Sequence, residues 1–169
     1  EIRAVADRYQ ITILEDAAEA MGSTFKGKQC GTFGDIGALS FNGNKIITTS
    51  GGGAVVTRSK ELKEKAVFLA TQARDDAPHY QHSEIGYNYR MSIVCAGIGR
   101  AQMEVLDQHV RLRREMHDFY RELFHSFTAV TLFEEPSPDY YSNHWLSAIT
   151  IDQKQANGKT PEELRLHLE

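Results

Sequence analysis

The sequence has little of what marks secreted, membrane or nucleic-acid-binding proteins. Its 169 residues include two cysteines, Cys30 and Cys95, which form no disulfide or metal-binding pattern. We expect both thiols to be reduced, in a cytoplasmic protein. No signal peptide and no run of about 18 apolar residues is present, so we expect no membrane span. The net charge is −4 and no basic run occurs, which argues against nucleic-acid binding.

Two nucleotide-binding signatures are also absent. The glycines Gly51 to Gly53 belong to no G-x-G-x-x-G fingerprint, and no Walker pattern is present. A nucleotide-binding domain built on these glycines is therefore disfavoured. What the chain does have is an ordinary soluble composition, 41% hydrophobic and 25% charged. A chain of this length can bury about 70% of its unfolded surface and form one core.

Hydrophobic periodicity predicts both helices and short strands. Ser59 and Thr160 are predicted helix N-caps, and Pro161 suits a first helical position. The segments 72–84 and 134–143 show no periodicity and are predicted to be loops. The predicted helices are 1–9, 59–71, 93–124 and the segment from 160, and the predicted strands are 11–14, 23–25, 38–41, 54–57, 129–133 and 145–151.

The helix predicted for 93–124 is the longest element. We expect a break near Gly97 or Gly99, and its length suggests a spine that joins two domains, 1–92 and 93–169. Its apolar residues recur at helical spacing, which is typical of a core-facing stripe. The residues predicted to face the core are Ile98, Ala101, Val105, Leu112, Met116, Phe119, Tyr120 and Leu123.

Lys45 is the first candidate for chemistry. It is the single lysine in a loop of Gly, Asn, Thr and Ser between two predicted strands, where small polar neighbours let a ligand approach the backbone closely. Lysine amines form imines with carbonyl groups, so this position suits a covalent carbonyl ligand. The residues alone also fit an exposed lysine in a hairpin-like loop.

Asp16 is the second candidate. A buried-type strand ends in Glu15 and Asp16 and is followed by small residues that can open a helix. Ligands of open α/β sheets bind outside the carboxyl ends of the strands. Asp16 could hold a protonated ring nitrogen there, as the acidic partner of pyridoxal phosphate (PLP) does. It could equally be a helix N-cap.

A third stretch, Gly86 to Ser92, carries Asn88 and Arg90. The Asn88 amide can donate a hydrogen bond, and the forked Arg90 cation suits a phosphate group. The alternatives are a turn residue for Asn88 and a surface ion pair for Arg90.

In order and spacing, these motifs resemble the DegT/DnrJ/EryC1/StrS family of sugar aminotransferases from residue 1 to about residue 125. The resemblance implies a fold type I PLP-dependent transferase, of which the chain holds part of the large-domain sheet and the start of the small C-terminal domain. It is strongest to the branch that aminates C4 of UDP-linked 4-keto-6-deoxy sugars for surface polysaccharide and protein glycosylation. The matching residues are Glu15 to Ala20, Gly34-Asp35, Ser40-Phe41, Lys45 to Thr49, Gly51 to Gly53 and Gly86 to Met91.

The resemblance implies a role for each candidate residue. Lys45 would hold PLP as a Schiff base and then carry the proton of transamination, with glutamate as the amino donor. Asp16 would keep the ring nitrogen protonated, and Ser40 would bind the phosphate. Glu19 would stand near the ring hydroxyl, where a carboxylate needs a proton or an intervening donor. A sister branch of dehydratases has histidine in place of the lysine, so Lys45 argues against dehydration.

The resemblance also implies a homodimer with shared active sites. Asn88 would reach into the neighbouring subunit's site and bind the cofactor phosphate, and Arg90 would lie near the sugar nucleotide. The chain begins and ends inside predicted helices, and the family's phosphate-binding turn and stacking aromatic precede the aspartate strand. We therefore expect a fragment of a longer enzyme. The alternative is that this piece is an inactive folded or dimerising module that binds no cofactor by itself.

Overall fold

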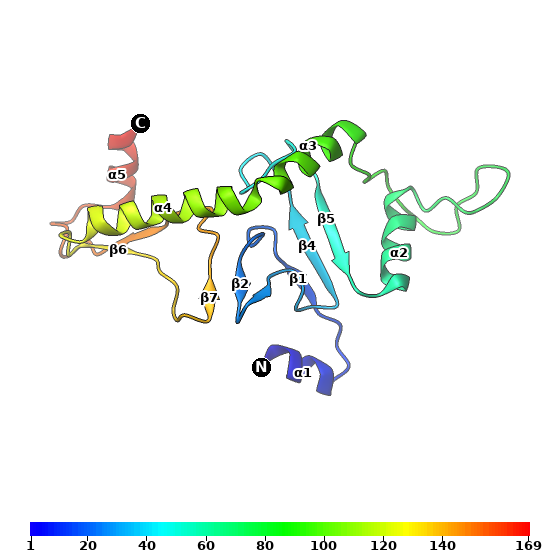
Figure 1. The fold of residues 1–169 in the computed structure, drawn as a ribbon, viewed down its shortest axis with the longest axis horizontal. Helices are drawn as coiled ribbons and strands as arrows, with labels where there is room; N and C mark the ends of the chain where they lie inside the picture. The colour runs from blue at the N-terminus through cyan, green and yellow to red at the C-terminus, as the bar shows by residue number, and fades with distance from the viewer.

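The computed structural model describes residues 1–169 and has an elongated shape (Figure 1). The long helix α4 runs along one side, three small sheets lie beneath or beside it, and α2 lies at the opposite end from α5. The elements are α1 (Ile2–Arg8), β1 (Leu14–Asp16), β2 (Thr24–Phe25), β3 (Lys28–Gln29), β4 (Ile36–Ser40), β5 (Gly53–Thr57), α2 (Lys60–Ala70), α3 (Ile93–Glu104), α4 (Leu106–Phe124), β6 (Val130–Leu132), β7 (Tyr140–Tyr141), β8 (Ile149–Ile151) and α5 (Pro161–Leu168). None of these helices is both long and apolar enough to span a bilayer.

The central sheet has the strand order β1-β4-β5. β1 is parallel to β4, with Asp16 paired to Ala38, and β4 is antiparallel to β5, with Ser40 paired to Gly53. Because the carboxyl ends of parallel strands meet at one edge, Asp16 and Ser40 lie at the same edge of this sheet. The loop that carries Lys45 leaves from that edge.

The first strand lies further along the chain than predicted. The prediction placed it at 11–14, whereas β1 begins at Leu14. The Ile13 N–H donates to Asp35 Oδ2 at 2.8 Å, and the Ile13 carbonyl accepts from the Asp35 N–H at 2.9 Å. These bonds hold Ile13 against the turn before β4, so the strand pairing starts one residue later.

A second sheet contains two unpredicted strands, β3 and β7. β7 pairs with β2, which also pairs with β3, although 134–143 was predicted as a loop. The Phe25 and Tyr140 rings lie 4.7 Å apart between centroids, so an aromatic pair supports this short pairing. The predicted strand at 145–151 is shorter, since β8 begins at Ile149 and pairs with β6. Trp145 and Leu146 form a bend, and His144 before them has a φ of 43°, so the chain becomes extended only at β8.

The helix boundaries largely confirm the predicted caps. Ser59 Oγ accepts from the Leu62 N–H at 3.2 Å, and Thr160 forms a reciprocal capping box with Glu163. The predicted break at Gly97 or Gly99 is wrong, because the chain breaks at Val105 between α3 and α4. Gly99 instead allows α3 to pack closely against the loop that carries Thr49, since a Cβ at Gly99 would lie 2.9 Å from the Thr49 methyl group.

The core is small, and the predicted apolar stripe does not form it. Leu112, Met116 and Phe119 have exposed fractions of 49%, 49% and 57%, whereas Val110 is 3% exposed. At about 100° per residue, positions 110 and 112 point to roughly opposite sides of a helix. The core therefore uses the other face of α4. Its buried cluster is Met21, Ile46, Ile47 and Val110, against which Leu39, Phe41, Leu106 and Trp145 pack.

Candidate active site

The loop between β4 and β5 is closed by backbone hydrogen bonds of Phe41. Its N–H donates to the Gly52 carbonyl at 2.9 Å, and its carbonyl accepts from the Thr49 N–H at 3.0 Å. Gly52 has a φ of 94°, a left-handed conformation that glycine adopts without strain. Ile46 and Ile47 turn into the core, with exposed fractions of 8% and 1%. The loop is therefore a packed turn and not a free hairpin tip.

The paired helices α3 and α4 hold this loop from behind. Gln102 Oε1 accepts from the Thr48 N–H at 3.0 Å, and His109 Nδ1 lies 3.1 Å from the Ile46 carbonyl oxygen. A carbonyl can only accept, so Nδ1 carries the proton in this contact. Both contacts fix backbone groups next to Lys45, which restricts where its side chain can start. Sequence patterns gave no sign of either contact.

The Lys45 side chain is 12% exposed, which contradicts the alternative of an exposed loop lysine. Its Nζ lies 3.0 Å from Glu19 Oε1 and 4.6 Å from the centroid of the Trp145 ring. The ammonium group thus has a carboxylate on one side and an aromatic face on the other, and both attract a cation. Trp145 was predicted to begin a strand and was not expected at this site.

Asp16 lies at the end of β1, but the predicted helix after it does not form, so the N-cap alternative is wrong. Its Oδ1 accepts from the Ala18 N–H at 3.1 Å, and no hydrogen bond or ion pair occupies Oδ2. Ser40 Oγ accepts from the Asn42 N–H at 3.3 Å. Asp16 is therefore an exposed carboxylate with one free oxygen at the sheet edge, and Ser40 keeps its hydroxyl proton for a further partner.

Glu15, the neighbour of Asp16, has a structural role. Its carboxylate accepts from the backbone N–H groups of Gly31, Phe33 and Gly34 at 2.5, 2.7 and 3.1 Å. Adjacent strand residues point to opposite faces, so the two carboxylates are separated by the sheet. Glu15 thereby fixes the glycine-rich turn before β4.

We expect Glu15→Ala to destabilise the protein strongly. It leaves three part-buried N–H groups without their acceptor, and an unpaired buried donor costs about 1–3 kcal/mol. The free energy of unfolding should fall by about 3 kcal/mol, measured by denaturant titration with Glu61→Ala, a change on the exposed face of α2, as the control. A stability equal to that of the control would contradict the role given to Glu15.

Asn88 and Arg90 form no hydrogen bond or ion pair with Lys45 in this chain. The backbone of Asn88 forms an isolated bridge with Thr71, and the Tyr89 N–H donates to the Ala70 carbonyl at 3.0 Å. Both side chains are exposed, and neither has a hydrogen bond or ion pair with Lys45, Asp16 or Glu19. The surface ion pair considered for Arg90 is not formed. These residues are thus free to meet a group that this chain does not supply.

A large apolar cleft lies away from Lys45. It has a volume of about 1070 Å³, lies between α2 and one face of β4 and β5, and includes Val55, Val67, Tyr87 and Arg90 in its lining. Thirteen of its 18 lining residues are hydrophobic. None of Lys45, Asp16, Glu19, Ser40 and Asn88 lines it, and Arg90 is the one predicted site residue that does. The cleft is therefore separate from the groups around Lys45.

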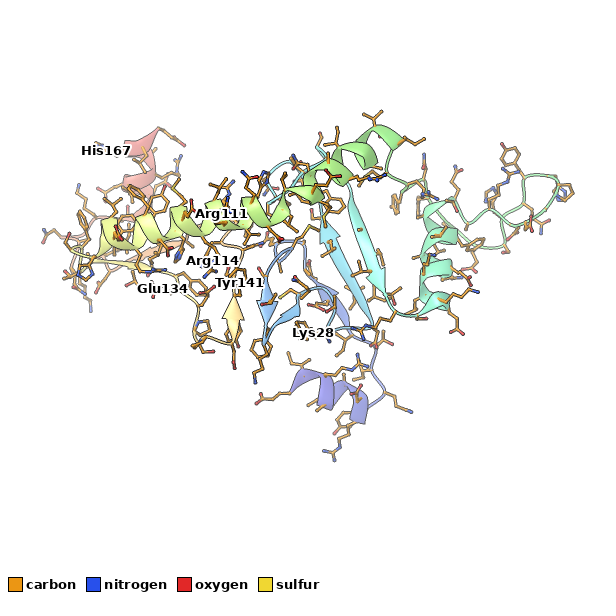
Figure 2. The ribbon with its side chains drawn as sticks, in the orientation of Figure 1. Lys28, Arg111, Arg114, Glu134, Tyr141 and His167 are labelled. Carbon is orange, nitrogen blue, oxygen red and sulfur yellow. The ribbon has the colours of Figure 1, made fainter.

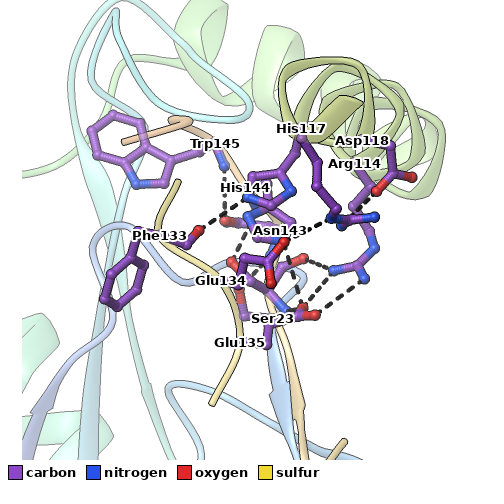
Figure 3. A network of polar contacts seen from close by, with 12 residues as sticks. Ser23, Arg114, His117, Asp118, Phe133, Glu134, Glu135, Asn143, His144 and Trp145 are labelled. Carbon is purple, nitrogen blue, oxygen red and sulfur yellow. Dashed lines mark hydrogen bonds and ion pairs between the residues drawn. The ribbon is translucent and has the colours of Figure 1, made fainter. Parts of the chain in front are cut away.

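A polar cluster joins α4 to the segment before β8 (Figures 2 and 3). Arg114 of α4 lies over the Tyr141 ring of β7, 4.2 Å from its centroid, and donates to Glu135 Oε1 at 2.7 Å and to the Ser142 carbonyl at 2.6 Å. Burial would raise the pKa of Glu135, but hydrogen bonds from Arg114 and from the Ser142 N–H outweigh it and lower that pKa.

Two buried histidines stack beside this cluster. The His117 and His144 rings have centroids 3.7 Å apart, and His117 Nε2 lies 3.0 Å from the Phe133 carbonyl oxygen. Burial lowers the pKa of His144, and the neighbouring His117 acts in the same direction. The folded protein therefore favours the neutral imidazole of His144.

This shift makes stability depend on pH. The unfolded chain binds a proton at His144 below about pH 6.5, whereas the folded chain resists it, so stability falls as the pH falls from about 6.5. We expect His144→Asn, which suits the positive φ, to reduce the loss of the melting temperature between pH 7 and pH 5.5. His79→Asn, in the exposed loop, is the matched control and should leave the slope unchanged. An unchanged slope in His144→Asn would refute the assignment.

Comparison with known proteins shows which family the chain matches. A match to the DegT/DnrJ/EryC1/StrS aminotransferase family covers residues 1–169. EpsN of Bacillus subtilis (strain 168), named as a pyridoxal phosphate-dependent aminotransferase, is 49% identical over 164 residues, which are 97% of this chain and 41% of EpsN. GDP-perosamine synthase of Escherichia coli O157:H7 is 40% identical over 168 residues, which are 99% of this chain and 44% of that enzyme.

A solved structure agrees with the sequence matches. Helicobacter pylori PseC, an aminotransferase involved in the biosynthesis of pseudoaminic acid, superposes with a TM-score of 0.86 and 26% identity, over 98% of this chain and 45% of that chain. This likeness confirms the predicted α/β transferase fold. The chain spans about two fifths of the length of the curated relatives it matches. With a match over its whole length and close relatives of the same kind, the chain belongs to the DegT/DnrJ/EryC1/StrS aminotransferase family.

Proposed function

We propose that the full-length protein is a PLP-dependent aminotransferase. It transfers an amino group from glutamate to the keto carbon of a 4-keto-6-deoxy nucleotide sugar, for polysaccharide or glycoprotein biosynthesis. The observation that carries the proposal is the setting of Lys45. A mostly buried primary amine stands between Glu19 and Trp145, on a loop that leaves the sheet edge where Asp16 and Ser40 lie. Family membership supports the same reaction type.

The residues at this edge fit PLP by their chemistry. Lys45 Nζ can bond to the aldehyde carbon, and the free Oδ2 of Asp16 can hold the protonated ring nitrogen. The Ser40 hydroxyl can donate to the phosphate. When bound, PLP draws electrons away from the substrate carbon, which makes its proton easier to remove. The proposed roles thus divide between a covalent anchor, a charge partner and a phosphate donor.

Lys45 and Glu19 would also handle protons. The Lys45 amine would be the base that takes the proton from the carbon bearing the amino group of the donor, and its ammonium form would be the acid that delivers a proton to the keto carbon of the sugar as that carbon gains the amino group. Glu19 Oε1, at 3.0 Å, holds the ammonium form in place during that exchange. Its other proposed neighbour is the ring hydroxyl, where Glu19 would act through its own proton or an intervening donor.

The substrate is proposed as a class. The sequence motifs resemble a branch that uses UDP-linked sugars, whereas one relative is named for a GDP sugar. UDP-linked and GDP-linked 4-keto-6-deoxy sugars are therefore both to be tested, with UDP as the expectation from the sequence. A cytoplasmic location is part of the proposal. Nucleotide sugars suit that compartment, and so do two cysteines, Cys30 and Cys95, that are both free thiols.

We further propose a homodimer with shared sites, in which Asn88 binds the phosphate of the partner's cofactor and Arg90 lies near the sugar nucleotide. The exposure of both side chains and their lack of contacts with Lys45 support this arrangement. The division into 1–92 and 93–169 stays a prediction.

A mixed dimer tests the shared site. When Lys45→Ala and Asn88→Asp chains are exchanged, one site of the mixed dimer collects both changes and the other collects neither. With equal mixing, half of the dimers are mixed and each has one intact site, so activity should return to about a quarter of the wild-type value. Two inactive parents that stay inactive after verified subunit exchange would show that Asn88 acts within its own chain.

The cofactor assignment is tested by trapping. The full-length protein is incubated with PLP and treated with borohydride, which reduces an imine to a stable amine, and the labelled peptide is identified by mass spectrometry. The label is expected on Lys45. A label on Lys60 or Lys63, or no label at all, would overturn the proposed function.

A further inference from the structure

Asn143 is a buried polar residue that lies between the two groups in contact with Lys45. It is 2% exposed, and its Nδ2 donates to the carbonyl oxygens of Glu19 and Met21, both at 2.9 Å. Its Oδ1 accepts from the Trp145 N–H at 3.1 Å. One side chain thus joins the backbone that carries Glu19 to the backbone that carries Trp145, as Figure 3 shows for the Trp145 side.

The chemistry of these contacts requires an amide. Two carbonyl oxygens can only accept, and a backbone N–H can only donate, so the partner must offer two donors and one acceptor in a fixed arrangement. Asparagine meets this demand in a single orientation. An aspartate of the same shape would offer no donor and would place its charge against two carbonyl oxygens.

The segment around Asn143 is held from both sides. On one side the Asn143 N–H donates to Ser23 Oγ at 2.9 Å. On the other side Glu135 Oε1 accepts from the Ser142 N–H at 2.6 Å. The Glu135 contact fixes the same segment, but Glu135 has no contact with Glu19, Trp145 or Lys45. The chain therefore supplies a matched control for a position that only stabilises the fold.

We propose that Asn143 is a positioning residue of the Lys45 site, a role that rests on the proposed function. It sets the spacing between Glu19 and Trp145, and thereby the place of Lys45 Nζ, which both contact. Misplacement of a reacting group by about 1 Å can cost about 100-fold in rate, so a backbone link of this kind matters to an amine that must meet a carbonyl carbon.

The test compares two isosteric variants of the full-length protein, Asn143→Asp and Glu135→Gln. Three quantities are measured for each: the melting temperature, acrylamide quenching of Trp145, and the PLP concentration that gives half-maximal borohydride labelling of Lys45. Trp145 is the single tryptophan of these 169 residues, and Trp145→Phe gives the background from any other tryptophan. Asn143→Ala serves as a second variant if Asn143→Asp does not fold.

Asn143→Asp is expected to raise Trp145 quenching about twofold and the labelling concentration about tenfold. Glu135→Gln is expected to lower the melting temperature without changing either quantity by as much as about twofold. The proposal would be overturned if the Asn143 variants showed wild-type quenching and labelling. It would also be overturned if Glu135→Gln changed quenching and labelling as much as the Asn143 variants do for the same loss of melting temperature. If the wild-type protein takes up no PLP, the proposed function is overturned. The quenching measurement needs no cofactor, so it still decides whether Asn143 positions Trp145.

Discussion

Replacing Lys45 by alanine in the full-length protein is expected to lower the rate of transamination by about 10⁴-fold or more. The substitution removes the amine that we propose to anchor the cofactor and, in the same side chain, the group that we propose to carry the proton. Its loop is held by Gln102, His109 and the core, so the loop should keep its shape without the Lys45 side chain. The measurement is the steady-state formation of the amino sugar with glutamate as donor.

Two matched variants isolate the chemistry of Lys45. Lys45→Arg keeps a cation near Glu19 but offers no amine that can form an imine, so it should be as inactive as Lys45→Ala. Lys60→Ala removes an exposed lysine that pairs with Glu64, and it should keep wild-type activity. Substantial turnover by Lys45→Arg would mean that the position contributes charge and not covalent chemistry.

Asp16→Ala is expected to lower the rate by about 100-fold or more, which is the usual effect of removing one preorganised electrostatic partner. The reason is that a ring nitrogen without an acidic partner loses its proton easily and draws electrons less strongly. The loss of stability should be small, about 1 kcal/mol, because Asp16 makes one hydrogen bond, to the Ala18 N–H. Activity is measured as for Lys45→Ala, and stability by denaturant titration.

Asp16→Asn separates the charge from the hydrogen bond. Its side-chain oxygen can still accept from the Ala18 N–H, but it has no negative charge, so it should be about as inactive as Asp16→Ala. Near-normal turnover in either variant would reduce Asp16 to a turn residue. For the adjacent Glu15 we expect mainly a loss of stability and not of chemistry, because its carboxylate accepts hydrogen bonds from three backbone N–H groups of the chain itself.

Local signals in the sequence were sufficient for much of the fold. Ser59 and Thr160 cap helices as predicted, because capping depends on residues within one turn. The strands on both sides of Lys45 were also predicted correctly, to within two residues at each end. The order of the helices and of the strands other than β3 and β7 follows from such local patterns.

The remaining features depend on contacts between distant residues. The apolar stripe of α4 was assigned to the core by its spacing alone, but spacing does not say which face meets another element. Trp145 and Asn143 reach Lys45 and Glu19 across more than half of the chain, and no local pattern marks them for that role. β7 is supported by the contact between Tyr140 and Phe25, and the turn-rich local sequence around Tyr140 does not predict that contact. The roles of Asp16, Ser40, Asn88 and Arg90 stay predictions.

The hydrogen bonds of Asn143 also set an order of events during synthesis. They join positions that are 120, 122 and 124 residues apart in the chain. At about 5–20 residues per second, a ribosome needs roughly 6–24 s to add that many residues. For the part of this time that follows the addition of Lys45, the nascent chain holds Lys45 without Trp145 against its amine. The enclosed form of the Lys45 site is thus reached only after residue 145 has left the ribosome, so the proposed cofactor would meet that form only after most of this chain has been translated.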